Sequence, residues 1–247
     1  MLNNAIILAA GRGGRLKPFT NDTPKALLSL EDDYKLIDII FQSLKKNLVG
    51  NVSIVVGYMY NSIVQYVSAK YSFPDFSICY ILNRDYDKTN TAYSLLLTCP
   101  ALQNGGLIIN GDTLISPSSL EKLSKFNGTC VGISHRNVDD EAVKVVYEPN
   151  NKVSAIGKKV KGIAEYVGVA KIEPTFGSLM CKQLNYLFSF NKELLKSLYY
   201  DDVINHLLCY HPVYAVDLTD EIVMDIDTME DLNYAKRLLS NYKRMFK

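Results

Sequence analysis

The sequence lacks the residue spacings that mark common metal and redox sites. Its five cysteines are scattered, odd in number and free of any CxxC pair, which argues against disulfides and zinc. The three histidines form no HExxH motif and accompany no serine or cysteine nucleophile elbow. We therefore expect reduced thiols in a cytoplasmic protein and no catalytic histidine.

An excess of positive charge and long apolar runs are also missing. Lysine and arginine number 27 against 26 acidic residues, so nothing offsets the phosphates of a nucleic acid. No apolar run reaches the length of a membrane span, and Asn3 and Asn4 precede a run too short for a signal peptide. We expect neither a nucleic-acid nor a membrane partner, and one domain over residues 1–247.

Apolar runs and helical periods alternate through residues 1–128. This alternation predicts a doubly wound, mostly parallel, Rossmann-like α/β sheet. The expected strands are 5–9, 52–56, 76–82 and 106–109, and the expected helices 34–46, 59–71, 91–98 and 117–126.

Residues 129–247 change rhythm and predict a β-rich extension. Turn signals join the expected strands, which favours antiparallel pairing. The expected strands are 130–135, 144–148, 152–156, 164–172 and 213–218, and the expected helices 174–188, 200–210 and 229–242. We interpret residues 1–128 as a nucleotide-binding half and residues 129–247 as an acceptor-binding half.

A glycine-rich loop follows the first expected strand, in ILAAGRGGRLKPFTNDTPKALL (residues 7–28). Gly11, Gly13 and Gly14 let the backbone approach an anion closely at the carboxyl edge of the sheet, and Arg12 and Arg15 add positive charge. The P-loop motif is absent, and Leu16 stands where the dinucleotide fingerprint needs its third glycine. The loop therefore predicts a phosphate site of another kind.

The full pattern, GxGxRLxPxTxxxPKxLL, resembles the signature of the nucleotidyltransferase family, which joins a nucleoside monophosphate to a phosphorylated sugar or small alcohol. The resemblance implies a GT-A-like fold, an Arg15 that grips the triphosphate and a Lys25 close to the α-phosphate. Solvated loop charge is the alternative for these cations, and for Arg12 both interpretations stay open. The predicted nucleotide-binding residues of this region are Leu8, Ala9, Ala10, Gly11, Gly13, Gly14 and, after a later strand, Gly111.

Two acidic positions lie at expected strand or helix ends, far apart in sequence. Asp112 follows an apolar strand in LIINGDTLI, and Asp227 precedes the last helix in VMDIDTMEDL. Mg²⁺ takes one or two carboxylates together with phosphate oxygens, and the resemblance implies that these aspartates bind it. The alternatives are a turn closed by Asp112 and a helix capped by Asp227. For Asp225 the choice stays open.

The segment NRDYDKTNTAYSLL (residues 83–96) carries polar side chains around an expected helix start. Asn83, Thr89 and Asn90 are predicted to contact the nucleotide base, with ordinary helix capping as the alternative. The segment resembles the phosphocholine cytidylyltransferase branch of the family. The glutamine-proline and glycine-leucine pattern typical of thymidylyl- and uridylyltransferases is absent, which favours cytosine.

The acceptor is expected in the second half. Lys158 is a candidate for its phosphate, and Glu165 and Tyr166 for an ammonium group. A solvated basic hairpin also explains the lysines. Asp201 and Asp202 are interpreted as charges that favour a helix N-terminus.

These features together predict a Mg²⁺-dependent enzyme that transfers CMP from CTP to a small phosphorylated acceptor, phosphocholine-like or a phosphonate, and releases pyrophosphate. A sugar-1-phosphate uridylyl- or thymidylyltransferase and a non-catalytic nucleotide-binding module are the alternatives. A homodimer is compatible with the tyrosine-rich second half.

Overall fold

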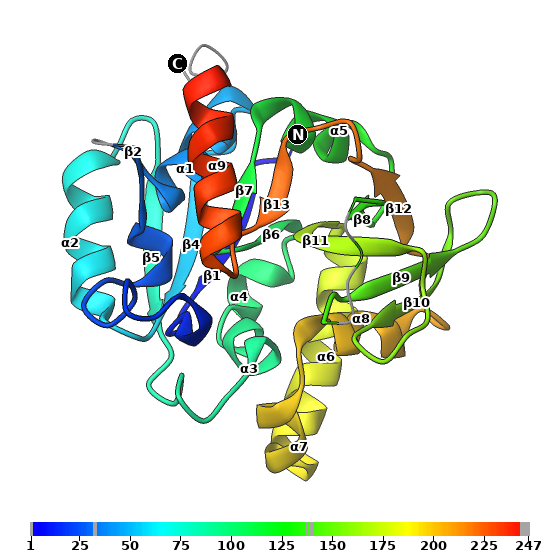
Figure 1. The fold of residues 1–247 in the computed structure, drawn as a ribbon. Helices are drawn as coiled ribbons and strands as arrows, with labels where there is room; N and C mark the ends of the chain where they lie inside the picture. The colour runs from blue at the N-terminus through cyan, green and yellow to red at the C-terminus, as the bar shows by residue number, and fades with distance from the viewer. Residues whose placement is uncertain (1, 32–33, 137, 139–140, 243–247) are drawn as a thin grey trace.

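Figure 1 shows the computed structural model, which describes every residue except 1, 32–33, 137, 139–140 and 243–247. The first half contains β1 (Asn4–Ala9), β2 (Ser29–Glu31), β3 (Tyr34–Lys35), α1 (Leu36–Lys46), β4 (Asn51–Val56), α2 (Tyr60–Lys70), β5 (Ser77–Leu82), α3 (Thr91–Leu96), α4 (Cys99–Leu102), β6 (Gly106–Asn110), β7 (Thr113–Ile115) and α5 (Pro117–Lys125). The second half contains β8 (Cys130–Ser134), β9 (Lys144–Tyr147), β10 (Val153–Gly157), β11 (Ala164–Ile172), α6 (Pro174–Phe190), α7 (Lys192–Ser197), α8 (Tyr200–Leu207), β12 (Tyr214–Asp217), β13 (Val223–Asp225) and α9 (Met229–Tyr242).

A mostly parallel central sheet confirms the predicted α/β class. In the described part of the chain its order is β10-β9-β11-β6-β1-β4-β5, and β8 joins β11 to β12. The pairs β1–β4, β1–β6, β4–β5 and β8–β12 are parallel, whereas β11 is antiparallel to β6, β8 and β9. Because β11 pairs with β6, one sheet crosses both halves of the chain.

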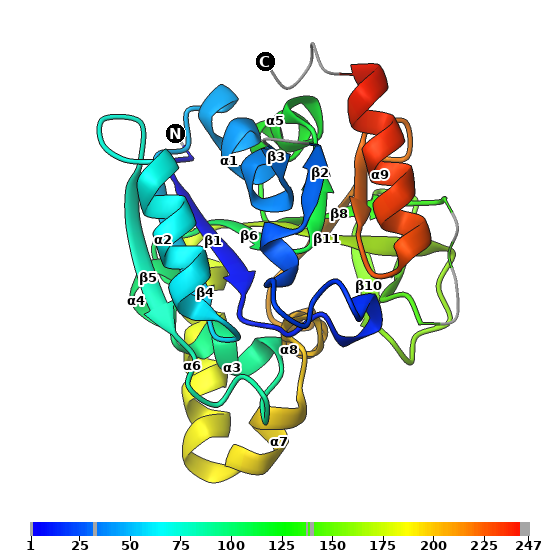
Figure 2. The ribbon, with the colours of Figure 1, turned by 60° about the vertical axis from the view of Figure 1, so that its left-hand side comes forward.

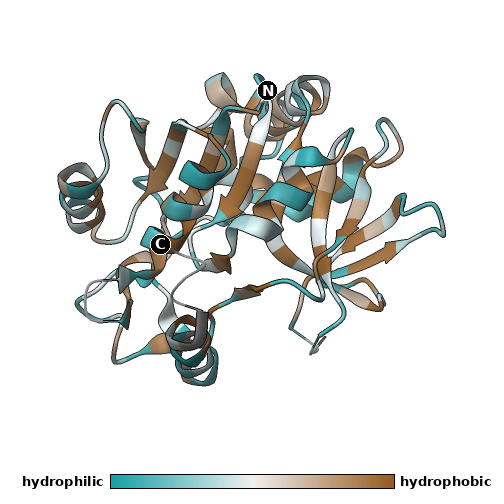
Figure 3. Ribbon diagram, turned by 90° about the horizontal axis from the view of Figure 1, so that it is seen from above, coloured by the Kyte–Doolittle hydropathy of each residue, from teal (hydrophilic) through white to brown (hydrophobic). Residues whose placement is uncertain are grey.

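Helices cover both faces of the sheet, and the alternation of β1 shows why. Ile6 and Leu8 belong to the buried cluster that includes α3, α4, α6 and α8, while Ile7 belongs to the cluster that includes α1, α2 and α5. Successive side chains of a strand point to opposite faces, so a continuous apolar run is needed. Figure 3 shows hydrophobic strand residues at the centre and hydrophilic helix residues outside. Each fully buried Ile contributes about 1.5–3 kcal/mol.

The last helix returns to the opening of the chain. In a third buried cluster, Leu232 and Leu239 of α9 join Leu16 of the opening loop and Leu30 of β2. The short strand β13 pairs with β7, which directly follows β6. Figure 2 shows α9 on the same side of the sheet as β2. This packing brings residues separated by some two hundred positions to one edge of the sheet.

Most predicted elements are present, and the differences concern short ones. The helix predicted over residues 91–98 ends at Leu96 as α3, the helix predicted over residues 34–46 starts only at Leu36, and sequence analysis missed α4, α7, β2, β3, β7 and β13. The three residues of β7 or β13 are too few to show a period. The sequence did contain a signal for the start of α7, because Asn191 is a residue type that often caps helices. Its side chain accepts a hydrogen bond from the Leu194 amide. Among the described residues, no helix combines the length and apolar character needed to cross a bilayer.

Candidate active site

A cleft of about 1460 Å³ lies where β1 and β6 end. Its walls come from the opening loop, the segment after β6, β11, the start of α8 and α9. This is the edge at which open α/β sheets bind ligands. The predicted site residues that line it are Leu8, Ala9, Gly11, Gly13, Gly14, Arg15, Lys25, Asn90, Gly111, Asp112, Lys158, Glu165, Tyr166 and Asp227.

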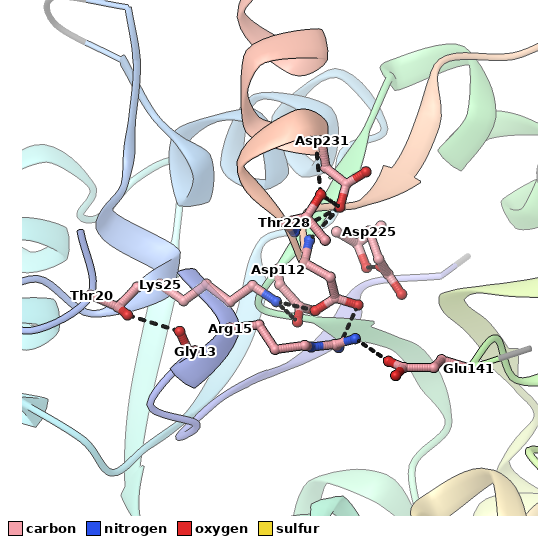
Figure 4. Close-up of polar contacts among 11 residues, drawn as sticks. Gly13, Arg15, Thr20, Lys25, Asp112, Glu141, Asp225, Thr228 and Asp231 are labelled. Carbon is pink, nitrogen blue, oxygen red and sulfur yellow. Dashed lines mark hydrogen bonds and ion pairs between the residues drawn. The ribbon is translucent and has the colours of Figure 1, made fainter. Parts of the chain in front are cut away.

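Lys25 joins the two predicted metal-binding aspartates (Figure 4). Its Nζ lies 2.6 Å from Oδ2 of Asp112 and 2.7 Å from Oδ1 of Asp227. The lysine side chain is 11% exposed, against 30% and 33% for the carboxylates. The two acids therefore converge on one point at the floor of the cleft.

Charge pairing outweighs burial in this cluster. Burial lowers the pKa of Lys25, but attraction to Asp112 and then Asp227 raises it, with a net increase. Burial likewise raises the pKa of Asp227, whereas Lys25 and then Arg15 lower it, and the net shift is downward. Lys25 thus stays a cation and Asp227 an anion at neutral pH.

Arg15 spans the mouth of the cleft. Its guanidinium lies 2.8 Å from Oδ2 of Asp227 and 2.8 Å from Oε2 of Glu141, and its side chain is 54% exposed. Sequence analysis missed Glu141, because it lies in a stretch without a periodic pattern. An exposed pair of this kind contributes little to stability, so the guanidinium is available to a polyphosphate at small cost.

The helix cap at the start of α9 is Thr228, with Asp231 as its partner. The Thr228 Oγ1 accepts from the Asp231 amide at 3.2 Å, and Asp231 Oδ2 accepts from the amides of Thr228 and Asp227 at 2.7 and 3.0 Å. The Asp227 carboxylate contacts Lys25 and Arg15 instead. Capping is therefore done by other residues, and the Asp227 carboxylate faces the cleft.

The opening loop presents open backbone to the cleft. Gly13 adopts a left-handed conformation (φ 65°), and its carbonyl accepts from the Thr20 hydroxyl at 2.8 Å. A Cβ at Gly11 or Gly14 would meet no atom within 4 Å. The loop is thus closed by its own hydrogen bond and leaves room for an anion beside these two glycines.

Asp225 lies half-buried near Asp112. Thr113 Oγ1 donates to its Oδ1 at 2.5 Å. Burial and then repulsion by Asp112 raise the pKa of Asp225 well above its usual range. Gly168 of β11 makes this packing possible, since a Cβ there would lie 2.4 Å from Thr113 Oγ1 and 2.8 Å from Asp225 Oδ1.

The segment after β5 makes mostly internal contacts. Asn83 is buried, donates to Thr89 Oγ1 at 3.0 Å and Ser94 Oγ at 3.1 Å, and accepts from the Asp85 amide. Asn90 lines the cleft while its side-chain amide donates to the Ser197 carbonyl. Asn83, Thr89 and Ala10 are not among the lining residues. Their contact with the nucleotide stays a prediction.

The opposite wall contains a buried tyrosine pair. The hydroxyls of Tyr166 and Tyr200 lie 2.5 Å apart, and the rings meet edge to face with centroids 6.0 Å apart. Beside them, Lys158 Nζ lies 4.5 Å from the ring centroid of Tyr199. Tyr166 and Lys158 were predicted here, whereas Tyr199 and Tyr200 were not.

Asp201 is a further residue of this wall, and its environment differs from the predicted one. Asp202 Oδ2 accepts from the Tyr199 amide at 2.9 Å and acts at the start of α8 as expected. Asp201 is instead 4% exposed, and its Oδ2 has no hydrogen-bond partner in the described part of the chain. Burial and then Asp202 raise the pKa of Asp201 to about 7.

Comparison with known proteins settles the family. The sequence model of the family described as "Nucleotidyl transferase" matches residues 4–132, which include the opening loop and Asp112. The chain belongs to this family. The nucleotidyl transferase is also 26% identical, over 96% of its own length and 98% of its relative's, to the choline-phosphate cytidylyltransferase of Streptococcus pneumoniae.

Two further similarities extend over nearly the whole enzyme. The CTP:phosphoglutamine cytidylyltransferase of Campylobacter jejuni is 26% identical over 93% of this transferase and 97% of the relative. The solved inositol-1-phosphate CTP transferase of T. maritima matches with a TM-score of 0.81 and 25% identity, over 98% of this chain and 96% of that one. The similarity therefore includes the second half, beyond the segment that the family model matches.

Proposed function

We propose that this nucleotidyl transferase moves CMP from CTP to a small phosphorylated acceptor and releases pyrophosphate. The observation that carries the proposal is the convergence of Asp112, Lys25 and Asp227 beside a glycine loop with open backbone. The relatives support CTP as the donor, since the names of all three contain CTP or cytidylyltransferase.

The reaction needs positioning and charge rather than a protein nucleophile. An oxygen of the acceptor phosphate attacks the α-phosphorus, a new P–O bond forms, and the bond to the β-phosphate oxygen breaks. Lys25 stabilises charge on the α-phosphate and Arg15 stabilises the departing pyrophosphate. The acceptor phosphate is already ionised at neutral pH, so no general base is required.

Asp112 and Asp227 fit a divalent cation. The Lys25 ammonium shows that one cation contacts an oxygen of each carboxylate at once, and carboxylate oxygens are the ligands that Mg²⁺ prefers. Within the described residues, no three acidic, histidine or cysteine side chains gather as a metal site, which suits an ion held partly by substrate phosphates. When bound, Mg²⁺ polarises the phosphate oxygens and neutralises their charge.

The wall at α8 supports a cationic acceptor. The Oδ2 of Asp201 is a buried acceptor without a hydrogen-bond partner among the described residues, and the Tyr199 ring already holds an ammonium, that of Lys158. A phosphorylated amine or quaternary ammonium compound supplies the missing charge. We propose this class of acceptor, with Lys158 displaced toward its phosphate.

Pyrophosphate release, measured for ATP, GTP, UTP, dTTP and CTP with a panel of acceptors, tests the proposal. Phosphocholine, 2-aminoethylphosphonate, glycerol phosphate and glucose 1-phosphate separate cationic from neutral acceptors. We expect turnover with CTP and a cationic acceptor, loss of turnover with a chelator and recovery with Mg²⁺. Turnover with UTP or dTTP and a sugar phosphate would establish the alternative, and no turnover with any pair would favour a binding module.

A further inference from the structure

Tyr58 contacts the opening loop at its beginning and at its end. The Tyr58 amide donates to the Ala10 carbonyl at 3.0 Å, and the Tyr58 hydroxyl donates to the Asn21 carbonyl. The guanidinium of Arg12 lies over the Tyr58 ring, 5.1 Å from its centroid. One residue of the turn between β4 and α2 therefore holds the segment 10–21.

The turn can come this close because Gly57 precedes Tyr58. A Cβ at Gly57 would lie 2.8 Å from the Ala10 carbonyl oxygen and 2.6 Å from Cβ of Tyr86. The Tyr86 ring packs against the Tyr58 ring, with centroids 6.1 Å apart. Tyr86 thus packs against the Tyr58 ring while Tyr58 contacts the loop.

The loop needs external contacts of this kind. Leu16 is buried in a hydrophobic cluster, but Gly11 and Gly14 have open space on the side where a Cβ would stand. Glycine backbone loses more conformational freedom on ordering than any other residue. A ligand that had to order this loop would bind more weakly by that entropy.

We propose that Tyr58 is a positioning residue that keeps the opening loop ordered for the triphosphate. This inference rests on the proposed function, because it takes the polyphosphate of CTP as the ligand of the loop. Tyr58 is not among the residues that line the cleft, so it acts through the loop backbone and Arg12. The same geometry explains Arg12: its guanidinium packs on Tyr58, and Arg12 is also absent from the lining of the cleft.

The role predicts a change in binding rather than in the chemical step. Lys25 is held by its own contacts with Asp112 and Asp227, so kcat should stay within about twofold. Tyr58→Phe removes only the hydrogen bond to Asn21 and should raise the KM for CTP about fivefold. Tyr58→Ala also removes the ring under Arg12 and should raise it roughly 10- to 30-fold. Arg12→Ala should raise the KM for CTP about threefold.

A direct binding measurement separates positioning from a general structural effect. Inorganic tripolyphosphate and cytidine are titrated separately onto wild type, Tyr58→Phe and Tyr58→Ala. The loop contacts phosphates, so affinity for tripolyphosphate should fall by the same factor as for CTP, while affinity for cytidine stays unchanged. Tyr60→Phe, at an exposed tyrosine at the start of α2, is the matched control and should behave as wild type.

Each outcome decides between the two claims. If wild type neither binds nor turns over CTP, the proposed function fails. If wild type does both and the two Tyr58 variants bind tripolyphosphate as wild type does, Tyr58 has no positioning role. A fall in kcat with an unchanged KM would also overturn the inference. Tyr58→Phe retains the ring, so it gives a result even if Tyr58→Ala does not fold.

Discussion

The carboxylates on the two walls of the cleft differ in their burial and in their charged partners. On the loop side, Asp112 and Asp227 share the ammonium of Lys25, and Asp227 also contacts Arg15. On the opposite side, Asp201 is more deeply buried and its Oδ2 has no hydrogen-bond partner among the described residues. The carboxylates of the first wall are thus paired with cations of the chain, whereas the acid of the second wall is buried with an unsatisfied oxygen, which is costly unless something pairs with it.

Removing Lys25, the cation that Asp112 and Asp227 share, tests the loop-side wall most directly. We expect Lys25→Ala to lower kcat for pyrophosphate release about 10³-fold, roughly 4 kcal/mol, because charge on the α-phosphate loses its stabilising partner. The fold should remain, as circular dichroism can show. Lys17→Ala, at an exposed lysine of the same loop, is the control. Near-normal turnover of the Lys25 variant would refute the role.

Gly168→Ala tests the strand that connects the two walls. A left-handed residue with φ 70° and a Cβ 2.4 Å from Thr113 Oγ1 should lower the free energy of unfolding by about 2–4 kcal/mol. Urea denaturation measures this change. Gly14→Ala, where a Cβ meets nothing within 4 Å, should unfold at the wild-type urea concentration. Equal stability of the two variants would contradict the packing described for β11.

Asp201→Asn tests whether the opposite wall holds the cationic part of an acceptor. It should raise the KM for a cationic acceptor about 10- to 100-fold, roughly 1.4–3 kcal/mol, because the acceptor loses its buried counter-charge. The KM for CTP should not change, since Asp201 lies on the opposite wall. Glycerol phosphate, a neutral-headed acceptor, is the matched control. An equal rise in KM for both acceptors would show that Asp201 only supports the fold.

Asp201 should also make the stability of the fold depend on pH. The folded pKa of Asp201, about 7, exceeds the unfolded value near 4, so its neutral form stabilises the fold at low pH. This contribution is fully present below about pH 4 and is lost as pH rises from there to about 7, by up to about 1.4 kcal/mol per unit. The difference in unfolding free energy between wild type and Asp201→Asn, measured from pH 4.5 to 8, isolates it from Asp225. A constant difference would contradict a buried, neutral Asp201.

Much of the loop side could be predicted from sequence because its signals are local. A complete motif surrounds Gly11 to Lys25, and Asp112 follows a continuous apolar strand that must end at the sheet edge. Asp227 was predicted because the segment VMDIDTMEDL resembles the one that carries a metal-binding aspartate in the family. The contact of Lys25 with both acids could not be predicted, because it depends on how α9 packs against the opening loop.

The opposite wall was harder to predict because its decisive property is burial. Asp201 and Asp202 are adjacent acids at a helix start, and sequence gives both the same interpretation. In the structure Asp202 accepts a backbone hydrogen bond, whereas Asp201 is almost fully buried. Tyr200 carries a partial signal, since it shares the helical spacing of Val203, Ile204 and Leu207. That spacing identifies a buried face but not which acid lies beside it.

Strand β11 sets a limit on how this enzyme can work. Its backbone is hydrogen-bonded to β8 on one side and to β6 and β9 on the other, so one continuous sheet connects the two walls of the cleft. A hinge motion that moved the two walls apart would break many of these backbone hydrogen bonds. The distance between the opening loop and the wall at α8 is therefore set by the sheet, and we expect the length of an acceptor to affect its turnover.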